Sequence, residues 1–289
     1  MPKLRLTNAG GSSSSGPGPK LISVLSGKGG VGKSVLAYNL AERIAARGSK
    51  TLLVDADFTG GNLHILANRD CPVGTGEYAA RKLSLSETTI ELADRLHLLG
   101  VAPEMVGSEN VTASGAARLI ERLRRDAEDF DLVVLDHSSG RSEVATVMAH
   151  GSDLCLLVVV PELTSISDAY GLCKYLRQSD ASIDCRLLVN RAASAEEADY
   201  IHKKLGAVTE RFLGEALRCQ GFVLEDGLVR ESVASQSTLA GLNSNSVVVQ
   251  ELNRIAQLLD GELLPATSRD SRSPQIENNE KSAMADIRG

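Results

Sequence analysis

A glycine-rich segment with one lysine and one serine at its end is the strongest chemical signal in the sequence. Residues 27–34 read GKGGVGKS and match the pattern G-x-x-x-x-G-K-[ST]. Residues 20–26 (KLISVLS) predict a strand before it, and residues 35–46 have helical character after it. Glycines let successive backbone N–H groups turn inward, and the helix points its positive dipole end at the same place. The segment therefore predicts a site for nucleotide phosphates.

Individual side chains of this segment suit a complex of ATP with Mg²⁺. Lys33 can reach the β- and γ-phosphates as a mobile charge, and the Ser34 hydroxyl can ligate Mg²⁺, which prefers oxygen ligands. Lys28 is not needed to form the nest, so it is either a solvent-exposed lysine or a charge that reaches phosphate, for example from a neighbouring subunit. The expected nucleotide-binding residues are Gly27, Lys28, Gly29, Gly30, Val31, Gly32, Lys33, Ser34 and Val35.

Carboxylates follow two apolar runs that predict buried strands. Asp55 and Asp57 come directly after one run, and Asp136 follows another. An aspartate at such a position can cap the next turn, but two such strands beside a phosphate loop favour a metal–nucleotide site. We expect Asp136 to belong to the Mg²⁺ shell, directly or through water, with Asp55 assisting. Asp57 is the candidate for orienting or deprotonating the attacking water.

The elements that must position these groups alternate between strands and helices. Short apolar runs predict strands at 21–25, 51–54, 96–99, 132–135, 154–160, 185–189 and 221–224. Amphipathic periodicity predicts helices at 33–47, 114–128, 164–178, 194–205 and 247–259. Several strand runs are continuous rather than alternating, as in strands buried on both faces. The pattern predicts an α/β fold: a doubly wound, mainly parallel sheet with helices on both faces.

Composition divides the 289 residues into three parts. Residues 1–19 contain a Gly/Ser/Pro run and predict a flexible linker. Residues 20–262 show no composition break and predict one P-loop ATPase domain. Residues 263–289 predict a disordered polar tail. The chain lacks a signal-peptide pattern at its beginning, and no apolar run is long enough to span a bilayer.

Several of these segments together resemble the MinD/ParA family of ATPases. Residues 28–34 look like its deviant Walker A motif, with Lys28 as the signature lysine. Residues 55–63 (DADFTGGNL) resemble its switch I, and residues 136–140 (DHSSG) resemble its Walker B and switch II. Residues 161–170 (PELTSISDAY) are similar to a segment of the flagellar-number branch, FlhG/FleN. Residues 188–190 (LVN) resemble the strand whose asparagine, here Asn190, contacts adenine.

The resemblance, which runs from about residue 20 to 259, implies a mechanism. ATP binding would bring two subunits face to face as a homodimer, and Lys28 would reach the partner's ATP. Lys28, Lys33 and Asp57 would be the catalytic residues, and hydrolysis with a regulatory protein partner would reset the dimer. The chain departs from the pattern in the residues after Asp136 and in Leu224, which stands where the family usually has proline.

Charge and cysteine content argue against several other functions. A net charge of −6 disfavours a wholesale electrostatic grip on nucleic acid. Four arginines lie close together at 118, 122, 124 and 125, where a solvated helix face is favoured. The five cysteines have no C-x-x-C spacing, so neither a disulfide framework nor a metal cluster is indicated. We expect a cytoplasmic protein.

Membrane contact is left open by the sequence but is not supported by the last helix. MinD and flagellar relatives carry a basic amphipathic C-terminal helix that binds lipid. Here Val248, Leu252, Ile255 and Leu259 fall on one face of the helix, but the other face lacks a cationic stripe. Packing on the core is therefore favoured, and the protein would be at most peripheral at the inner face of the plasma membrane.

Four functions compete at this point. The leading one is an ATP-driven dimerisation switch that regulates the placement or number of a cellular structure, such as flagella. A ParA-like partition ATPase that binds DNA non-specifically is the first alternative, although the acidic balance opposes it. A metallocluster carrier would require suitably spaced cysteines, and a nucleotide-binding scaffold would bind ATP with little turnover.

Overall fold

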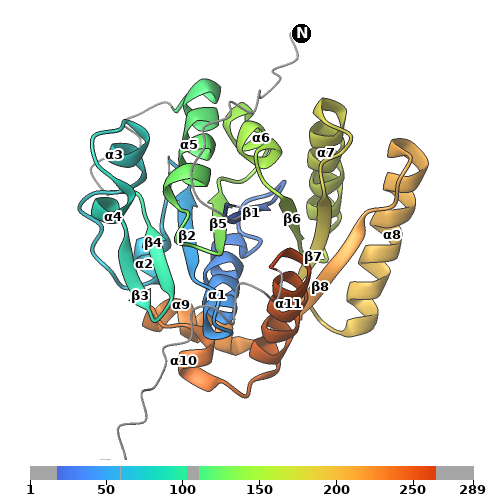
Figure 1. Cartoon of the computed structure of the whole chain (residues 1–289). Coiled ribbons are helices and arrows are strands. Elements are labelled where there is room, and N and C mark those ends of the chain that lie inside the picture. Colours follow the sequence, from blue (N-terminus) through green and yellow to red (C-terminus); the bar gives the residue numbers. More distant parts are fainter. Residues whose placement is uncertain (1–17, 59, 103–110, 265–289) are drawn as a thin grey trace, which may run out of the picture.

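A mainly parallel sheet of eight strands forms the centre of the molecule (Figure 1). The computed structural model describes residues 18–58, 60–102 and 111–264. The strands follow the spatial order β3-β4-β2-β5-β1-β6-β7-β8, and every neighbouring pair is parallel except β3 with β4. Their bounds are Lys20–Leu25 (β1), Thr51–Ala56 (β2), Ile90–Ala93 (β3), Leu96–Leu99 (β4), Leu132–His137 (β5), Leu154–Val159 (β6), Cys185–Ala192 (β7) and Arg218–Leu224 (β8). Strands β2, β5 and β6 are buried at every residue, as continuous apolar runs predict.

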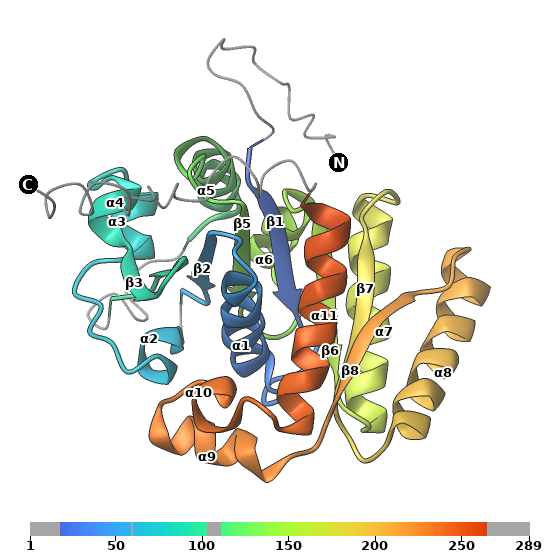
Figure 2. The same cartoon turned by 60° about the horizontal axis from the view of Figure 1, so that its bottom comes forward.

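Helices cover both faces of this sheet (Figures 1 and 2). On one face, α1 (Lys33–Ala46) and α11 (Val247–Leu263) join a core cluster with the strands. The opposite face is covered by α5 (Ala113–Asp126), α6 (Glu143–His150), α7 (Leu163–Ser179) and α8 (Ala195–Leu213). The predicted doubly wound α/β fold is confirmed.

Two groups of short helices complete the described part of the chain. α2 (Leu63–Leu66), α3 (Thr75–Ala79) and α4 (Leu85–Thr88) lie between β2 and β3. α9 (Gly227–Ser235) and α10 (Leu239–Asn243) lie between β8 and α11, at the bottom of Figure 1. Both groups follow the carboxyl end of a strand, so they frame the edge of the sheet where ligands usually bind.

The topology places that edge where the sequence predicted it. β1 lies between β5 and β6, so the connections run outward from the centre of the sheet on both sides. All strands except β3 run in one direction, so their carboxyl ends share one edge. Asp55 of β2 is the register partner of Asp136 of β5, and Val24 of β1 is the next partner across. The two acidic strand ends and the loop after β1 therefore meet at this edge.

Some elements differ from the predicted ones for physical reasons. All seven predicted strands are present, but β3 is a short, half-exposed antiparallel edge strand whose pattern was too weak to predict. α8 continues to Leu213, eight residues past the predicted end at 205, because the buried Gly206 is held in the helix by packing on β7 and β8. α6 and the short helices have too few residues for a periodic signal.

The last helix packs on the core, as predicted. Val248, Leu252, Ile255 and Leu259 are at most 1% exposed. Asp260 is also buried and accepts hydrogen bonds from the Ser49 hydroxyl (2.9 Å) and the Arg47 Nε (3.2 Å), which fixes the end of α11 on α1. α11 extends to Leu263, one residue beyond the predicted domain boundary. Residues 1–17 of the predicted linker and 265–289 of the predicted tail lie outside the described residues.

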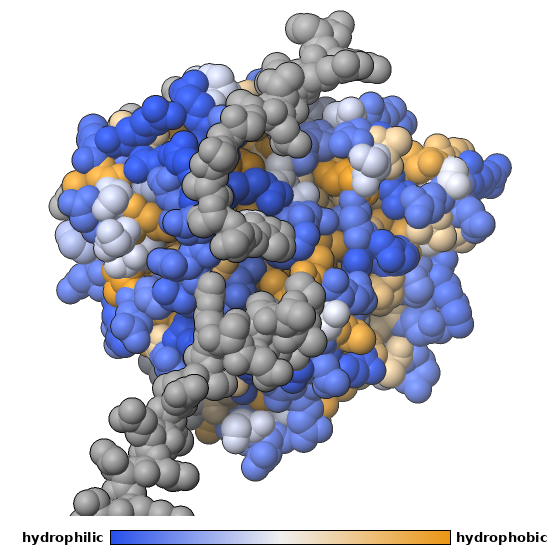
Figure 3. Space-filling view, in the orientation of Figure 1, coloured by the Kyte–Doolittle hydropathy of each residue, from blue (hydrophilic) through white to orange (hydrophobic). Residues whose placement is uncertain are grey.

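Exposed apolar side chains are dispersed over the surface. On the face shown in Figure 3, hydrophilic residues dominate and hydrophobic ones form small patches. The large exposed apolar residues come from several helices: Ile65, Leu163, Tyr175, Tyr200, Phe212, Val233, Val247 and Leu258. Among the helices of the described residues, none has the length and apolar character needed to cross a membrane.

Candidate functional site

The loop from Gly27 to Gly32 joins β1 to α1 and has the backbone of an anion nest. Gly30 and Gly32 have φ values of 77° and 85°, in the left-handed region that glycine adopts without strain. Gly32 is also the N-cap of α1, and it brings no side chain that could occupy the first N–H groups of the helix. These N–H groups and the helix dipole are therefore directed at the loop, where they suit a phosphate.

Two glycines of the loop are required by the crowding around it. A Cβ at Gly27 would lie 2.5 Å from the backbone carbon of Asp168 in α7, and a Cβ at Gly32 would lie 2.6 Å from Nδ2 of Asn190 in β7. The start of the loop is also fixed from β5, because the Gly140 N–H donates to the Ser26 carbonyl (2.8 Å). The loop is therefore held between α7, β7 and the segment after β5.

Lys33, Ser34 and Asp136 lie together at the end of this loop. The Lys33 Nζ donates to the Asp136 Oδ1 at 2.7 Å, and the two side chains are only 9% and 2% exposed. Burial raises the pKa of Asp136, while the charge of Lys33 and hydrogen bonds from Lys33 and Ser34 oppose that shift. One buried carboxylate thus lies within reach of both the phosphate-binding lysine and the hydroxyl predicted to ligate Mg²⁺.

Asp55 and Asp57 organise the segment that follows β2. The fully buried Asp55 carboxylate accepts hydrogen bonds from the Asp57 N–H and the Leu63 N–H, both at 3.1 Å. Asp57 is partly exposed, and its Oδ1 accepts from the Gly60 N–H (3.0 Å). Burial and the neighbouring charge of Asp136 raise the pKa of Asp55 to about 7. Asp55 therefore ties the backbone at Asp57 and at Leu63 to the end of β2. Its assistance to a metal stays a prediction.

Lys28 bonds to α7 rather than to its own loop. Its Nζ donates to Glu162, just before α7, and to the Thr164 Oγ1 (3.2 Å). Both side chains of the ion pair are partly exposed, at 38% and 52%. Lys28 is thus at the surface beside the phosphate loop, in contact with the segment 161–170 that the sequence singled out.

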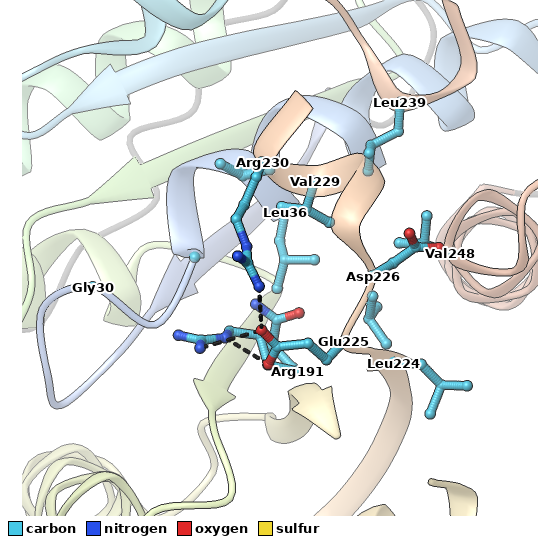
Figure 4. A pocket seen from close by; sticks show the side chains of 14 residues that line it. Gly30, Leu36, Arg191, Leu224, Glu225, Asp226, Val229, Arg230, Leu239 and Val248 are labelled. Atoms are coloured by element: carbon cyan, nitrogen blue, oxygen red, sulfur yellow. Dashed lines mark hydrogen bonds and ion pairs between the residues drawn. The ribbon is translucent and has the colours of Figure 1, made fainter. Parts of the chain in front are cut away.

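A cavity of about 360 Å³ adjoins the phosphate loop (Figure 4). Gly30, Gly32 and Val35 border it on one side, and Asn190 lies in its wall, where its Nδ2 donates to the Val31 carbonyl at 2.7 Å. The rest of the lining comes from β7, from the end of β8 and from α9 to α11. The volume and the mixed lining suit a base and ribose.

Charged side chains border this cavity that the sequence had not assigned to a site. Arg191 has a positive φ of 58°, and its Nε lies 3.1 Å from Glu225, which is also near Arg230 (3.9 Å). Figure 4 shows the three side chains converging at one side of the cavity. Arg191 follows Asn190 directly, and Glu225 follows β8 directly, so the rule that placed the aspartates at strand ends could have found both.

His137, at the end of β5, belongs to the core. Its Nε2 lies 2.8 Å from the Ser23 hydroxyl, which is 2.8 Å from the Ser152 hydroxyl. Burial and the charge of Lys33 lower the pKa of His137 to about 3, so the ring is neutral at physiological pH. Its polar contacts are therefore with side chains inside the protein.

Comparisons with known proteins agree with this geometry. The CobQ/CobB/MinD/ParA nucleotide binding domain family matches residues 22–239. The chain is 32% identical to the antiactivator FleN of Pseudomonas aeruginosa over 86% of this chain and 89% of that protein. It is 26% identical to the flagellum site-determining protein YlxH of Helicobacter pylori, over 84% and 83% of the two chains. In fold it is similar to the septum site-determining protein MinD of Pyrococcus horikoshii in complex with Mg-ADP (TM-score 0.71, 20% identity, 84% and 96% covered).

Proposed function

The chain belongs to the CobQ/CobB/MinD/ParA nucleotide-binding family, and from that premise we propose that it is a Mg²⁺-dependent ATPase that works as an ATP-driven dimerisation switch. The observation that carries the proposal is the buried pair of Lys33 and Asp136 at the end of a loop with two left-handed glycines. A buried lysine at the end of such a loop suits a polyphosphate, and the adjoining cavity suits the rest of a nucleotide.

The residues around Lys33 fit a magnesium ion as well as phosphate. Ser34 and Asp136 offer the hydroxyl and carboxylate oxygens that Mg²⁺ takes together with phosphate. The ion would neutralise charge on the phosphates, and the protein would supply position and positive charge. If Lys33 turned to a phosphate, Asp136 would lose its partner, and a magnesium ion held by Ser34 and Asp136 would supply the compensating charge.

Asp57 is the side chain proposed to handle the attacking water. It is partly exposed on the segment after β2, while the neighbouring Asp55 is fully buried and bonded to two backbone N–H groups. A carboxylate that is open to solvent and not saturated by backbone N–H groups is better placed to orient or deprotonate a water. The proposal therefore gives Asp57 the catalytic role, with Asp55 as the support of its segment.

Adenine recognition is proposed for the cavity between β7 and α9. Asn190 is held by the Val31 carbonyl through its Nδ2, so its Oδ1 is oriented as an acceptor for a base. Leu224, where the family usually has proline, lines the same cavity together with Val223 and Val229. An apolar wall with one oriented amide is a common arrangement in base-binding pockets.

Dimer formation is proposed to use the surface around Lys28. Lys28 and Glu162 form an exposed ion pair beside the phosphate loop, and Leu163 next to them is 76% exposed. A symmetric face of this kind allows Lys28 of each subunit to leave its own contact and reach the partner's phosphates. The similarity to FleN and YlxH supports a role in flagellar number or placement with a regulatory protein partner. We place the protein in the cytoplasm, at most peripheral to the membrane.

Non-specific DNA binding is a weaker proposal for this chain. Arg122 of α5 is only 12% exposed and donates to the Tyr78 and Leu83 carbonyls, so it is withdrawn from the surface. Arg124 donates to the Gly151 carbonyl but is 40% exposed. The arginines of α5 therefore offer a smaller cationic surface to DNA than their number suggests. The argument against a cluster carrier remains the one from the sequence, that the five cysteines lack C-x-x-C spacing.

Light scattering with ADP and then with ATP tests the switch. Asp57→Ala, which should block hydrolysis, is expected to give a dimer with Mg-ATP and a monomer with Mg-ADP. A monomer in both states, with ATP bound, would favour a nucleotide-binding scaffold and would refute the dimerisation switch.

A further inference from the structure

A glutamine at the end of α9, which borders the base cavity, is bonded to α2, which follows the segment that carries Asp57. The Gln236 Nε2 donates to the Ile65 carbonyl at 2.8 Å, between residues 171 positions apart in the sequence. Gln236 is the C-cap residue of α9, and Ile65 lies in α2. None of the functional assignments above uses this contact.

On the α9 side, Gln236 belongs to a rigid unit that borders the cavity. Val229 and Arg230 of α9 line the cavity. Gln236 has a left-handed backbone (φ 53°), and the turn is closed by the Ser237 N–H on the Ser232 carbonyl (3.0 Å) and by the Ser232 hydroxyl on the Ser237 carbonyl (2.6 Å). A displacement of α9 therefore moves the Gln236 side chain with it.

On the α2 side, the same contact reaches the predicted catalytic segment in two steps. The Leu63 N–H at the start of α2 donates to the Asp55 carboxylate, which also accepts from the Asp57 N–H. α2 has only four residues, so its own helical hydrogen bonds cannot hold it. Its position depends on contacts such as those with Asp55 and Gln236.

We propose that Gln236 is a positioning residue that couples occupation of the base cavity to the order of α2, whose first residue, Leu63, is bonded to Asp55. The inference rests on the proposed ATPase function and deepens it. A base in the cavity contacts α9 directly, fixes Gln236, and so restrains α2, whereas a polyphosphate without a base contacts only the loop. Ligands with and without a base then differ in their contact with α9 and hence with α2, and such a difference is the physical requirement for coupling.

A purely local packing contact would behave differently. If Gln236 only stabilised α2, its removal would loosen α2 equally with every ligand. If it transmits base occupation, its removal abolishes the difference between ligands with and without a base. The two cases are separated by the ratio of the α2 exchange rates measured with the two kinds of ligand in the same protein. A uniform loss of α2 stability changes both rates by the same factor, so it leaves their ratio unchanged.

Hydrogen–deuterium exchange of the full chain measures this ratio. The two ligands are the β,γ-imido analogue of ATP and inorganic tripolyphosphate, each saturating and with Mg²⁺. Peptides covering residues 62–68 report on α2, and those covering residues 27–34 report on the phosphate loop. The variants are Gln236→Gly, which suits the left-handed backbone, and Gln236→Glu, which keeps the shape but removes the donor. Gln250→Ala is the matched control, since Gln250 donates to a carbonyl (Asn245 O, 3.0 Å) far from α2 in sequence.

In the wild type and in Gln250→Ala, we expect residues 62–68 to exchange about three- to tenfold more slowly with the ATP analogue than with tripolyphosphate, the range that one neutral hydrogen bond supports. In both Gln236 variants the ratio should fall close to one. An unchanged ratio in these variants, or no ligand difference in the wild type despite protection of residues 27–34, would overturn the inference alone. Failure of both ligands to protect residues 27–34 would instead remove the proposed nucleotide function and the inference with it.

Discussion

The buried pair of Lys33 and Asp136 allows a quantitative prediction that does not require nucleotide. Lys33→Met removes the cation and keeps most of the volume of the side chain, so the change is mainly electrostatic. The lost contact is the 2.7 Å bond from the Lys33 Nζ to the Asp136 Oδ1, made by side chains that are 9% and 2% exposed. In the variant, water cannot replace the lysine at Asp136 without a local rearrangement.

The expected cost follows from this burial. Removing one partner of a buried ion pair typically lowers the free energy of unfolding by about 3–5 kcal/mol, because the remaining charge is uncompensated. The cost should also depend on pH. Burial raises the pKa of Asp136 above the ordinary value of 3.8. A raised pKa in the folded state gives stability that is present below 3.8 and lost as pH rises through the folded value. The positive charge of Lys33 limits this loss of stability at higher pH. Removing Lys33 should therefore lower the free energy of unfolding least at acid pH.

Urea unfolding without nucleotide at pH 5 and pH 8 measures both effects. We expect the larger loss at pH 8, and we expect Asp136→Asn in combination with Lys33→Met to recover most of it. Lys203→Met is the matched control, because Lys203 pairs with Asp199 at a similar distance of 2.6 Å but with 74% and 53% exposed side chains. Such exposed pairs contribute about 1 kcal/mol or less. Calorimetry of the same Lys33 variant should show no ATP binding.

Two results would refute this reasoning. A loss no larger than that of Lys203→Met at pH 8 would mean that Asp136 is hydrated or protonated with Lys33 present. Strict additivity of Lys33→Met and Asp136→Asn would mean that the two side chains do not interact in solution. Retained ATP affinity in Lys33→Met would separately refute the assigned phosphate site.

Further predictions concern the residues around this pair. Asp57→Ala should lower the ATP turnover rate by at least about tenfold without weakening ATP binding; unchanged turnover in a phosphate-release assay would remove Asp57 from the mechanism. Lys28→Ala should impair dimer formation, measured by light scattering, or ATP turnover more than it weakens nucleotide binding by the monomer, measured by calorimetry. Equal loss of all three would mean that Lys28 acts only within its own loop. Gly32→Ala should abolish nucleotide binding and lower the free energy of unfolding by about 1–3 kcal/mol. The reason is that φ is 85° and the new methyl group would lie 2.6 Å from the Asn190 side chain. Nucleotide binding as tight as in the wild type would show that the loop tolerates a side chain at this position.

The phosphate loop and the acidic strand ends could be predicted because their signals are local. The spacing of Gly27, Gly32 and Lys33 is fixed by one loop, and its context needs only the adjoining strand and helix. Asp55 and Asp136 are distant in sequence, but parallel strands bring their ends to one edge whatever the connections are. The rule that the carboxyl ends of parallel strands meet at one edge of the sheet is therefore enough to place both aspartates.

Apart from Asn190 and the phosphate loop, the lining of the base cavity was not predicted, and neither were the partners of Lys28. Lys28 meets Glu162 across 134 positions, and Gln236 meets Ile65 across 171. Such contacts depend on the exact packing of crossover helices, which periodicity does not determine. Arg122 shows the same limit: the sequence favoured a solvated arginine, but its side chain is 12% exposed and bridges α5 to the α3–α4 region.

The two buried carboxylates explain why the proposed site needs a divalent cation rather than a second lysine. Asp55 and Asp136 are register neighbours, and Lys33 pairs with only one of them. The raised pKa of Asp55, about 7, shows how far burial and the charge of Asp136 disfavour a second negative charge. A divalent ion near Asp136 would relieve this repulsion, and an ionised Asp55 would then bind the Asp57 and Leu63 N–H groups more strongly. In the proposed ATPase, metal binding would therefore tighten the same segment that Gln236 restrains from the side of the base.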